Sequence, residues 1–140
     1  MWLYDGIEIS DESLDGYVGF VYMITNLTNQ RKYIGKKLLK NRRTKIVKGK
    51  KKRTMIDSDW KVYWGSNKPL QEDVKSLGES NFTRQILRLC KSKGESNYWE
   101  AYYQFVNCVL FSDEWYNDHI WCRVHRSHVN KKVDNLDKPL

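Results

Sequence analysis

Two tyrosines and one glutamate are the residues of this 140-residue chain whose types and spacing could do chemistry. Tyr22 and Tyr33 are eleven residues apart, on the two arms of a predicted β-hairpin, so their phenols can lie close together. Glu100 is followed by Gln104 and Asn107 on a predicted helix, and this spacing aligns a carboxylate and two amides in one stripe. From spacing alone, cross-strand packing of the tyrosines and a solvated helix surface are the simpler interpretations.

The hairpin that carries the tyrosines is predicted over residues 17–35. Its first arm, Phe20 to Ile24, is rich in β-branched and aromatic residues, and residues 26–30 have turn chemistry. The second arm begins with Tyr33-Ile34-Gly35. We expect Gly35 to let the backbone leave the strand at an angle that other residues resist.

A helix and a strand are predicted downstream of the hairpin. The helix follows Gly65, with Asn67 as its N-cap, Pro69 in its first turn and Gly78 at its end. Residues 81–89 alternate apolar and polar positions, which fits a third strand, with a short helix as the alternative.

The strongest helical pattern runs from Ser96 to Phe111, with Ser96 as the predicted N-cap and a wide aromatic core face. We therefore predict an α/β fold in which helices flank a small, mostly antiparallel sheet of about three strands. Residues 1–140 are predicted to form one domain. Its three additions are an acidic N-terminal arm, partly a strand (1–16), a basic insertion (36–62) and a C-terminal extension (112–140).

Positive charge is concentrated in one stretch. Residues 36–53 contain eleven Lys and Arg and no acid, whereas the remaining residues contain fourteen bases and seventeen acids. The formal net charge of +8 therefore comes from this stretch. A strip of this kind indicates a polyanionic partner, most simply nucleic acid. A second hairpin or a loop, with its turn at Gly49, is expected here, and a disordered lysine loop is the plainer alternative.

The hairpin resembles that of the GIY-YIG endonucleases. Phe20-Val21-Tyr22 stands where the family has Gly-Ile-Tyr, with Phe20 in place of the glycine, and Tyr33-Ile34-Gly35 is the second tripeptide unchanged. Family members also carry a glutamate on the helix after the third strand, and Glu100 has that position here. The resemblance covers roughly residues 19–110 and points to small stand-alone phage or homing-type members.

The resemblance implies a mechanism for this site. Glu100 would hold Mg²⁺ or Mn²⁺ beside the scissile phosphate, where the ion stabilises the charge that develops on the oxygens. Tyr22 would help to activate the attacking water, and Tyr33 would position the water or the phosphate. Because an unperturbed tyrosine has a pKa of about 10, nearby basic residues and the metal would have to favour its ionised form.

The family also places a cation against the phosphate, commonly an arginine after the second tripeptide. Arg43 lies at the expected ten-residue spacing from Tyr33, but Lys36 and Lys37 are better placed if residues 36–62 are an insertion. Arg84 on the third strand is a further candidate. The expected DNA contacts are basic residues of the insertion and this strand: Lys40, Arg42, Arg43, Lys45, Lys48, Lys50, Lys51, Lys52, Arg53 and Arg84.

These observations predict a metal-dependent DNA endonuclease, encoded by a phage or mobile element, that acts on double-stranded DNA as a homodimer or by cutting the strands in turn. One alternative is a non-catalytic nucleic-acid-binding protein on the same fold. Another is a protein–protein module whose basic strip meets an acidic partner, with the acidic arm covering the strip in the free protein.

Other features bound the class of protein. No apolar run approaches the roughly 18 residues of a membrane span, and the acidic N-terminus is unlike a signal peptide. Three scattered cysteines indicate reduced thiols, and we expect a cytoplasmic protein, in the bacterial host if the chain is phage-encoded. Cys122, His125 and His128 are zinc-ligand types, with Cys108 as a fourth, but their spacing matches no common zinc module, and a basic tail near nucleic acid is preferred.

Overall fold

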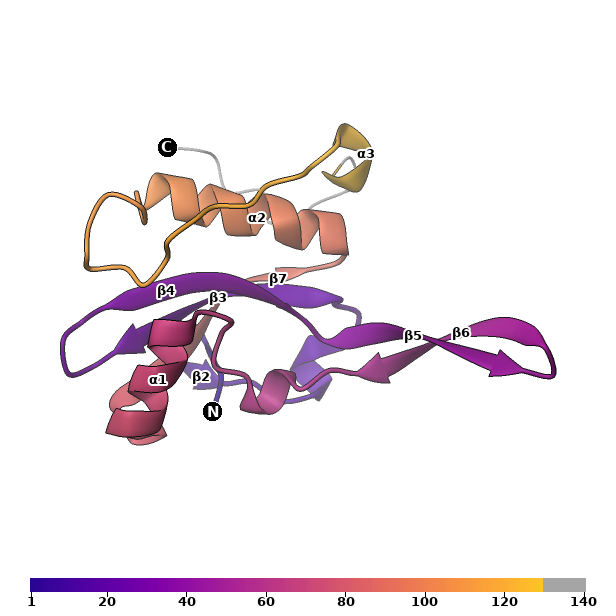
Figure 1. Cartoon of the computed structure of the whole chain (residues 1–140), viewed down its shortest axis with the longest axis horizontal. Coiled ribbons are helices and arrows are strands. Elements are labelled where there is room, and N and C mark those ends of the chain that lie inside the picture. Colours follow the sequence, from indigo (N-terminus) through magenta and orange to yellow (C-terminus); the bar gives the residue numbers. More distant parts are fainter. Residues whose placement is uncertain (130–140) are drawn as a thin grey trace.

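The computed structural model describes residues 1–129, which form an α/β fold around a five-stranded sheet. The strand order is β2-β1-β7-β3-β4 (Figure 1), and all neighbours are antiparallel except the parallel pair β1–β7. The strands are β1 (Leu3–Tyr4), β2 (Ile7–Glu8), β3 (Gly19–Asn26), β4 (Lys32–Leu38) and β7 (Phe82–Cys90).

The prediction of about three strands was too low, because the N-terminal arm adds two short strands to the sheet. Trp2 anchors this arm in the core, where its side chain is 3% exposed and its Nε1 donates to the Trp60 carbonyl at 2.7 Å. The acidic arm is therefore a sheet edge beside β7. Its Asp11 pairs with Lys61 at 3.0 Å, outside the basic strip that the arm would cover in the protein–protein alternative.

β3 is the central strand, and its side chains alternate between two cores. Phe20, Tyr22 and Ile24 belong to one buried cluster, whereas Val21 belongs to the other. The registers Tyr22↔Gly35 and Tyr22↔Ile86 place the first tyrosine between β4 and β7. The predicted hairpin and third strand are confirmed.

A helix covers each face of the sheet (Figure 1). α1 (Lys68–Leu77) begins as predicted: the Asn67 side chain accepts a hydrogen bond from Leu70 N at 2.9 Å, and Pro69 is in the first turn. α1 packs on the Tyr22 cluster, and α2 (Lys93–Val106) packs on the Val21 cluster.

The predicted start and end of α2 were wrong. Ser92 is the N-cap, since its side chain accepts from Glu95 N at 3.0 Å, and Glu95 Oε2 accepts from Lys91 N at 3.0 Å. These two bonds cap the start of the helix, one turn before Ser96. The helix ends at Val106, and Cys108 then has a left-handed backbone (φ 52°) that turns the chain.

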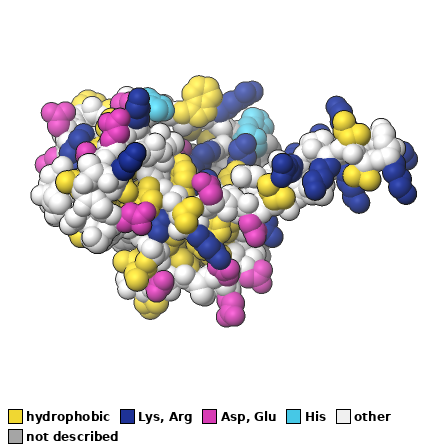
Figure 2. Space-filling view, turned by 60° about the horizontal axis from the view of Figure 1, so that its bottom comes forward, with side chains coloured by type: hydrophobic (Ala, Val, Ile, Leu, Met, Phe, Trp, Pro, Cys, Tyr) yellow, Lys and Arg dark blue, Asp and Glu magenta, His cyan; other side chains and the backbone are white. Residues whose placement is uncertain are grey.

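The basic insertion is a separate two-stranded hairpin, which we call the ribbon: β5 (Lys40–Val47) and β6 (Lys50–Asp57). Lys48 and Gly49 both have positive φ (52° and 75°), as a tight hairpin turn requires. The ribbon projects from the body (Figure 1), and Figure 2 shows that Lys and Arg crowd it.

The shorter helices are η1 (Glu12–Leu14), η2 (Trp60–Val62), η3 (Glu79–Asn81) and α3 (Arg126–Val129). The first part of the C-terminal extension is ordered against β4, because Lys32 N donates to Glu114 O at 2.9 Å and Tyr116 N donates to Lys32 O at 2.7 Å. The end of the extension, residues 130–140, lies outside the described residues. Within residues 1–129, no helix combines the length and apolar character that crossing a bilayer would take.

Candidate active site

The candidate site is a cleft of about 250 Å³ at the outer edge of β4, between the two helical layers. Tyr33, Glu100 and His119 line it, from β4, α2 and the C-terminal segment. Asn117 covers the strand edge at Ile34: its amide donates to Ile34 O at 2.8 Å and accepts from Ile34 N at 3.0 Å.

Glu100 continues the edge contacts of β4, because its carboxylate accepts a hydrogen bond from the backbone N–H of Lys36. Burial raises the pKa of Glu100 to about 6, while the Lys36 ammonium, the Lys36 N–H and His119 oppose the rise. Burial also lowers the pKa of Lys36, and Glu100 opposes that shift. Glu100, which lines the cleft, and the neighbouring Lys36 are therefore partly desolvated groups of opposite charge that act on each other.

Lys36 and Lys37 were equal candidates for the cation against the phosphate, and they point to opposite faces of the sheet because successive strand residues alternate. Lys36 lies on the α2 side with Glu100, whereas Lys37 lies on the α1 side. There the Lys37 ammonium contacts Asp59 at 2.6 Å and lies 3.9 Å from the centre of the Tyr63 ring. The structure thus brings Lys36, and not Lys37, to the candidate carboxylate.

The two tyrosines have different environments. Tyr33 is half-buried, lines the cleft and shares a hydrogen bond with Ser66 Oγ at 3.2 Å. Tyr22 is 1% exposed, and its ring centre lies 6.2 Å from that of Tyr33 and 6.0 Å from that of Tyr63. The tyrosine that meets the cleft is therefore Tyr33, whereas Tyr22 was expected to act on the water.

Burial raises the pKa of Tyr22 well above 10 and also raises the pKa of Tyr33. The neighbouring Tyr63 and Glu100 add to both shifts. The protein groups around these phenols, which are other phenols and carboxylates, therefore disfavour ionisation. The expectation that a tyrosine ionises also relied on the metal, and that part stays a prediction.

Gly35 is required for space, and not for the backbone angle that the sequence suggested. β4 continues through this residue to Leu38 without a positive φ. A Cβ at Gly35 would lie 2.5 Å from Tyr22 Oη and 2.9 Å from Tyr33 Cε1. The glycine therefore lets both tyrosines pack across the strand.

Arg84 was predicted to contact DNA, and the structure contradicts this. It is 4% exposed, with its guanidinium 4.6 Å from the ring centre of Trp2 and 4.2 Å from that of Trp64. It donates to the carbonyls of Lys61 (3.1 Å) and Tyr63 (2.9 Å). Arg84 is a core residue because β7 is an inner strand whose alternate side chains enter the α1-side cluster.

The predicted catalytic Arg43 does not reach the cleft. The ten-residue count from Tyr33 assumes a helix directly after Gly35, but β4 continues and leads into the ribbon, where Arg43 is exposed opposite Thr54. The other predicted DNA contacts of the insertion also lie on this ribbon, exposed and away from the cleft lining: Lys40, Arg42, Lys45, Lys48, Lys50, Lys51, Lys52 and Arg53.

Gln104 and His119 line the cleft, and sequence reasoning did not select them as site residues. Gln104 lies one turn after Glu100, is 5% exposed, and donates its Nε2 to Ile34 O at 3.0 Å. Its Oε1 has no hydrogen-bond partner within residues 1–129. The sequence signal that could have selected Gln104 was the polar stripe on α2. His119 follows the polar pair Asn117-Asp118, and its Nδ1 lies 2.6 Å from Asp118 Oδ1.

These oxygens fit a hard divalent cation, which prefers carboxylate and amide oxygens and keeps several waters. Glu100 would supply the carboxylate, with the unpartnered Gln104 oxygen and Asp118 on the same cleft wall. Within residues 1–129, no three His, Cys, Asp or Glu side chains form a group that could hold a metal ion. The search covered Cys108, Cys122, His125 and His128, the residues of zinc-ligand type. Any ion held by Glu100 would therefore rely largely on water.

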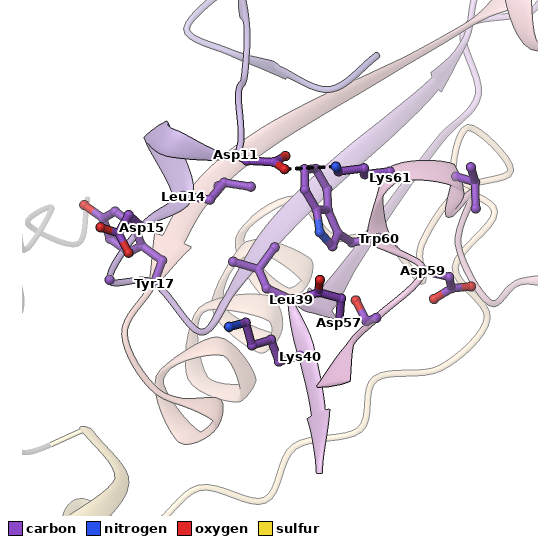
Figure 3. A pocket seen from close by; sticks show the side chains of 13 residues that line it. Asp11, Leu14, Asp15, Tyr17, Leu39, Lys40, Asp57, Asp59, Trp60 and Lys61 are labelled. Atoms are coloured by element: carbon purple, nitrogen blue, oxygen red, sulfur yellow. Dashed lines mark hydrogen bonds and ion pairs between the residues drawn. The ribbon is translucent and has the colours of Figure 1, made fainter. Parts of the chain in front are cut away.

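A larger hollow of about 470 Å³ lies at the base of the ribbon (Figure 3). Trp60 and Leu39 form its apolar part, and Asp11 and Lys61 pair across one side of it. It contains neither tyrosine of the hairpin and no part of the Glu100–Lys36 pair. The chemistry-bearing residues are in the smaller cleft.

The family comparison agrees with this fold and site. The family model "Putative endonuclease segE, GIY-YIG domain" matches residues 2–120. The chain therefore belongs to this GIY-YIG endonuclease family, as the two tripeptides and Glu100 predicted.

A particular relative is "Putative endonuclease segE" of Enterobacteria phage T4, which is 36% identical over 81 residues. The match covers 58% of this chain and 31% of the relative, so it spans less than a third of the relative's length. No solved structure gives a significant match to the chain.

Proposed function

We propose that the chain is a metal-dependent DNA endonuclease that hydrolyses phosphodiester bonds in the cleft at the β4 edge. The observation that carries the proposal is the half-buried Glu100 carboxylate, with its pKa near 6, beside Lys36 and within the cleft that Tyr33 lines. A partly buried carboxylate in a cleft, with a raised pKa and a basic side chain nearby, is typical of a functional site.

The proposed roles follow from these positions. A bound Mg²⁺ or Mn²⁺ would act as a Lewis acid on the scissile phosphate. Glu100 would hold the cation with its carboxylate, and Lys36 would contact a phosphate oxygen. Tyr33 would hydrogen-bond the phosphate or the attacking water, and Tyr22 would fix the position of Tyr33 by packing against it. His119, which is exposed at the cleft, is a candidate for proton transfer.

The proposal extends to origin and setting. The phage relative supports a phage or mobile-element source, either homing-type or cutting host or competitor DNA. In that case the substrate would be double-stranded DNA in the cytoplasm of a bacterial host.

One observation favours a second function, a nucleic-acid-binding protein without catalysis. Within residues 1–129, no arginine lines the cleft, although the family commonly uses an arginine against the phosphate. This second function keeps the basic ribbon and predicts tight, salt-sensitive binding with no cleavage.

Cleavage of supercoiled plasmid with Mg²⁺ or Mn²⁺ separates the two functions. We expect nicking or linearisation by the wild-type chain, and none by Glu100→Ala, which removes the carboxylate but leaves the aromatic core intact. Cleavage that survives the substitution would place the activity elsewhere. No cleavage by either protein, with salt-sensitive binding and with plasmids that carry the native target, would favour the binding protein.

A further inference from the structure

The pairing register of the ribbon divides its basic side chains between two faces. Directly opposite residues of an antiparallel pair point to the same face, and successive residues alternate. We call the face of Arg42↔Met55 and Thr44↔Arg53 the even face, and the face of Arg43↔Thr54 and Lys45↔Lys52 the odd face. The even face carries Lys40, Arg42, Lys51 and Arg53, and the odd face carries Arg43, Lys45, Lys50 and Lys52.

Basic residues on both faces are unusual for a hairpin that packs against the body of the same protein. Such a hairpin has one apolar face toward the core and one polar face toward water. Here β5 is exposed at every position, β6 at all but Thr54, and the two strands pair only with each other. Neither face is built to pack on the body.

The ribbon is also stabilised little by its own contacts. Lys45 and Lys52 are directly opposed like charges, and an isolated two-stranded hairpin is marginally stable in water. The apolar side chains Ile46 and Met55 are 75% and 57% exposed, so they form no core. Anionic groups against both faces would remove the repulsion and order the ribbon.

Positive charge is confined to the outer part of the ribbon. At its base Asp57 opposes Lys40, and this end of the ribbon meets the hollow that Asp11, Asp15 and Asp59 also line (Figure 3). Beyond the base, from Arg42 to Arg53, no acidic residue interrupts the basic side chains. Contact with a polyanion therefore begins two residue pairs beyond the base, at Arg42↔Met55, and extends to the tip.

We propose that the ribbon enters the major groove of duplex DNA, so that its two faces contact the phosphates of opposite strands. The inference rests on the proposed function in taking duplex DNA as the partner. The major groove of B-DNA, about 12 Å wide, admits a two-stranded ribbon without deformation, whereas the minor groove, about 6 Å wide, would first have to widen. Eight-residue strands span about 26 Å, which corresponds to about eight base pairs.

Insertion would also align the cleft with the DNA. β4 ends at Leu38 and β5 begins at Lys40, so one residue separates the strand of Tyr33 and Lys36 from the ribbon. Lys36 and the base of the ribbon are therefore about 13 Å apart along the chain. A ribbon in the groove would deliver a phosphate flanking that groove to the cleft.

Two matched variants test whether both faces touch DNA. The even-face double variant is Arg42→Gln with Arg53→Gln, and the odd-face double variant is Arg43→Gln with Lys52→Gln; each removes two charges. Binding to a duplex oligonucleotide is measured in EDTA over a series of salt concentrations. We expect both variants to bind more weakly, each with a salt slope shallower by about two. Loss in one variant alone would mean that the ribbon lies on the DNA with one face, and would overturn the proposal.

Methylation by dimethyl sulfate tests the groove, since guanine N7 lies in the major groove and adenine N3 in the minor groove. We expect protection of guanine N7 over about eight base pairs, absent when both faces are neutralised. Protection of adenine N3 alone, or of neither atom, would overturn the proposal. Duplex RNA should compete poorly because its major groove is deep and narrow.

Both measurements exclude metal, so they do not depend on cleavage. A chain that protects guanine N7 but never cuts plasmid would keep this inference and lose the proposed nuclease. A chain that cuts in a Glu100-dependent manner without N7 protection would keep the nuclease and lose the ribbon proposal.

Discussion

At the residue scale, Glu100 is the group whose titration should control activity. Its pKa of about 6 lies within reach of ordinary buffers, and the proposed cation needs the ionised carboxylate. We expect cleavage to fall about tenfold per pH unit below pH 6. Because protons and the cation compete for the same oxygens, a higher Mg²⁺ concentration should move the midpoint to lower pH. A midpoint independent of Mg²⁺ would exclude Glu100 as the metal ligand.

The same shift predicts that Glu100→Gln is inactive but more stable. The folded state raises the carboxyl pKa from 4.5 to about 6, so the ionised form costs the folded wild type roughly 2 kcal/mol, fully present above pH 6. That cost disappears as the pH falls from 6 to below 4.5, where the carboxyl is protonated in both states. Urea unfolding in EDTA should therefore favour the variant at pH 8 and show no difference at pH 4.

Removing the hydroxyl of Tyr33 should mainly affect cleavage, whereas removing the hydroxyl of Tyr22 should mainly affect stability. Tyr33→Phe removes the hydroxyl that lines the cleft, and we expect cleavage to fall at least tenfold with little loss of stability, because within residues 1–129 that hydroxyl bonds only the exposed Ser66. Tyr22→Phe removes a buried hydroxyl bonded to Tyr63, and should cost about 1 kcal/mol of stability with a smaller loss of cleavage. Single-turnover cleavage and urea unfolding of both variants test this; equal cleavage losses would contradict it.

Sequence reasoning selected Tyr33, Glu100 and Lys36 as candidates, and the structure places them near one another, but the sequence could not rank Lys36 against Lys37 and Arg43. That ranking depends on which face of β4 meets α2, and the face is fixed by packing between distant segments. Arg84 was misplaced for a related reason. Alternation on β7 was visible, but the two tryptophans that enclose the guanidinium come from residues 2 and 64.

At the element scale, the ribbon should be dispensable for folding. Replacing residues 45–53 with a short Gly/Ser turn removes exposed residues whose strand partners all lie within the ribbon, so the melting temperature should change little. DNA binding should weaken, and its salt dependence should become shallower. Thermal unfolding and gel shifts on the same preparation test both statements, and unchanged affinity would reject the ribbon as a DNA contact.

Elements with a local signal were predictable, and those that rest on tertiary pairing were not. The N-cap of α1 followed from Asn67 and Pro69, and the hairpin of β3 and β4 followed from its apolar arms and polar turn. β1 and β2 are only two residues long, and they exist because Trp2 is anchored beneath Trp60. No local pattern of that length distinguishes a strand from a loop.

At the scale of the whole molecule, the described residues form one Glu100 cleft and one ribbon, whereas the proposed substrate, duplex DNA, has two strands of opposite polarity. A single cleft can engage one scissile phosphate at a time. Cutting both strands therefore takes either two successive binding events or a second copy of the chain, related by the two-fold symmetry of the duplex.

This arrangement predicts sequential nicking when the protein is limiting. Supercoiled plasmid should convert first to open circles and only later to linear DNA, and the ratio of linear to open-circular product should rise with protein concentration if a homodimer forms on DNA. Cleavage of a duplex oligonucleotide labelled on each strand resolves the two steps. Linear product that appears without an open-circular intermediate, even at the lowest protein concentration, would mean that two clefts act together before either strand is cut. A homodimer already formed in free solution would then be required, and sedimentation of the DNA-free protein would show it.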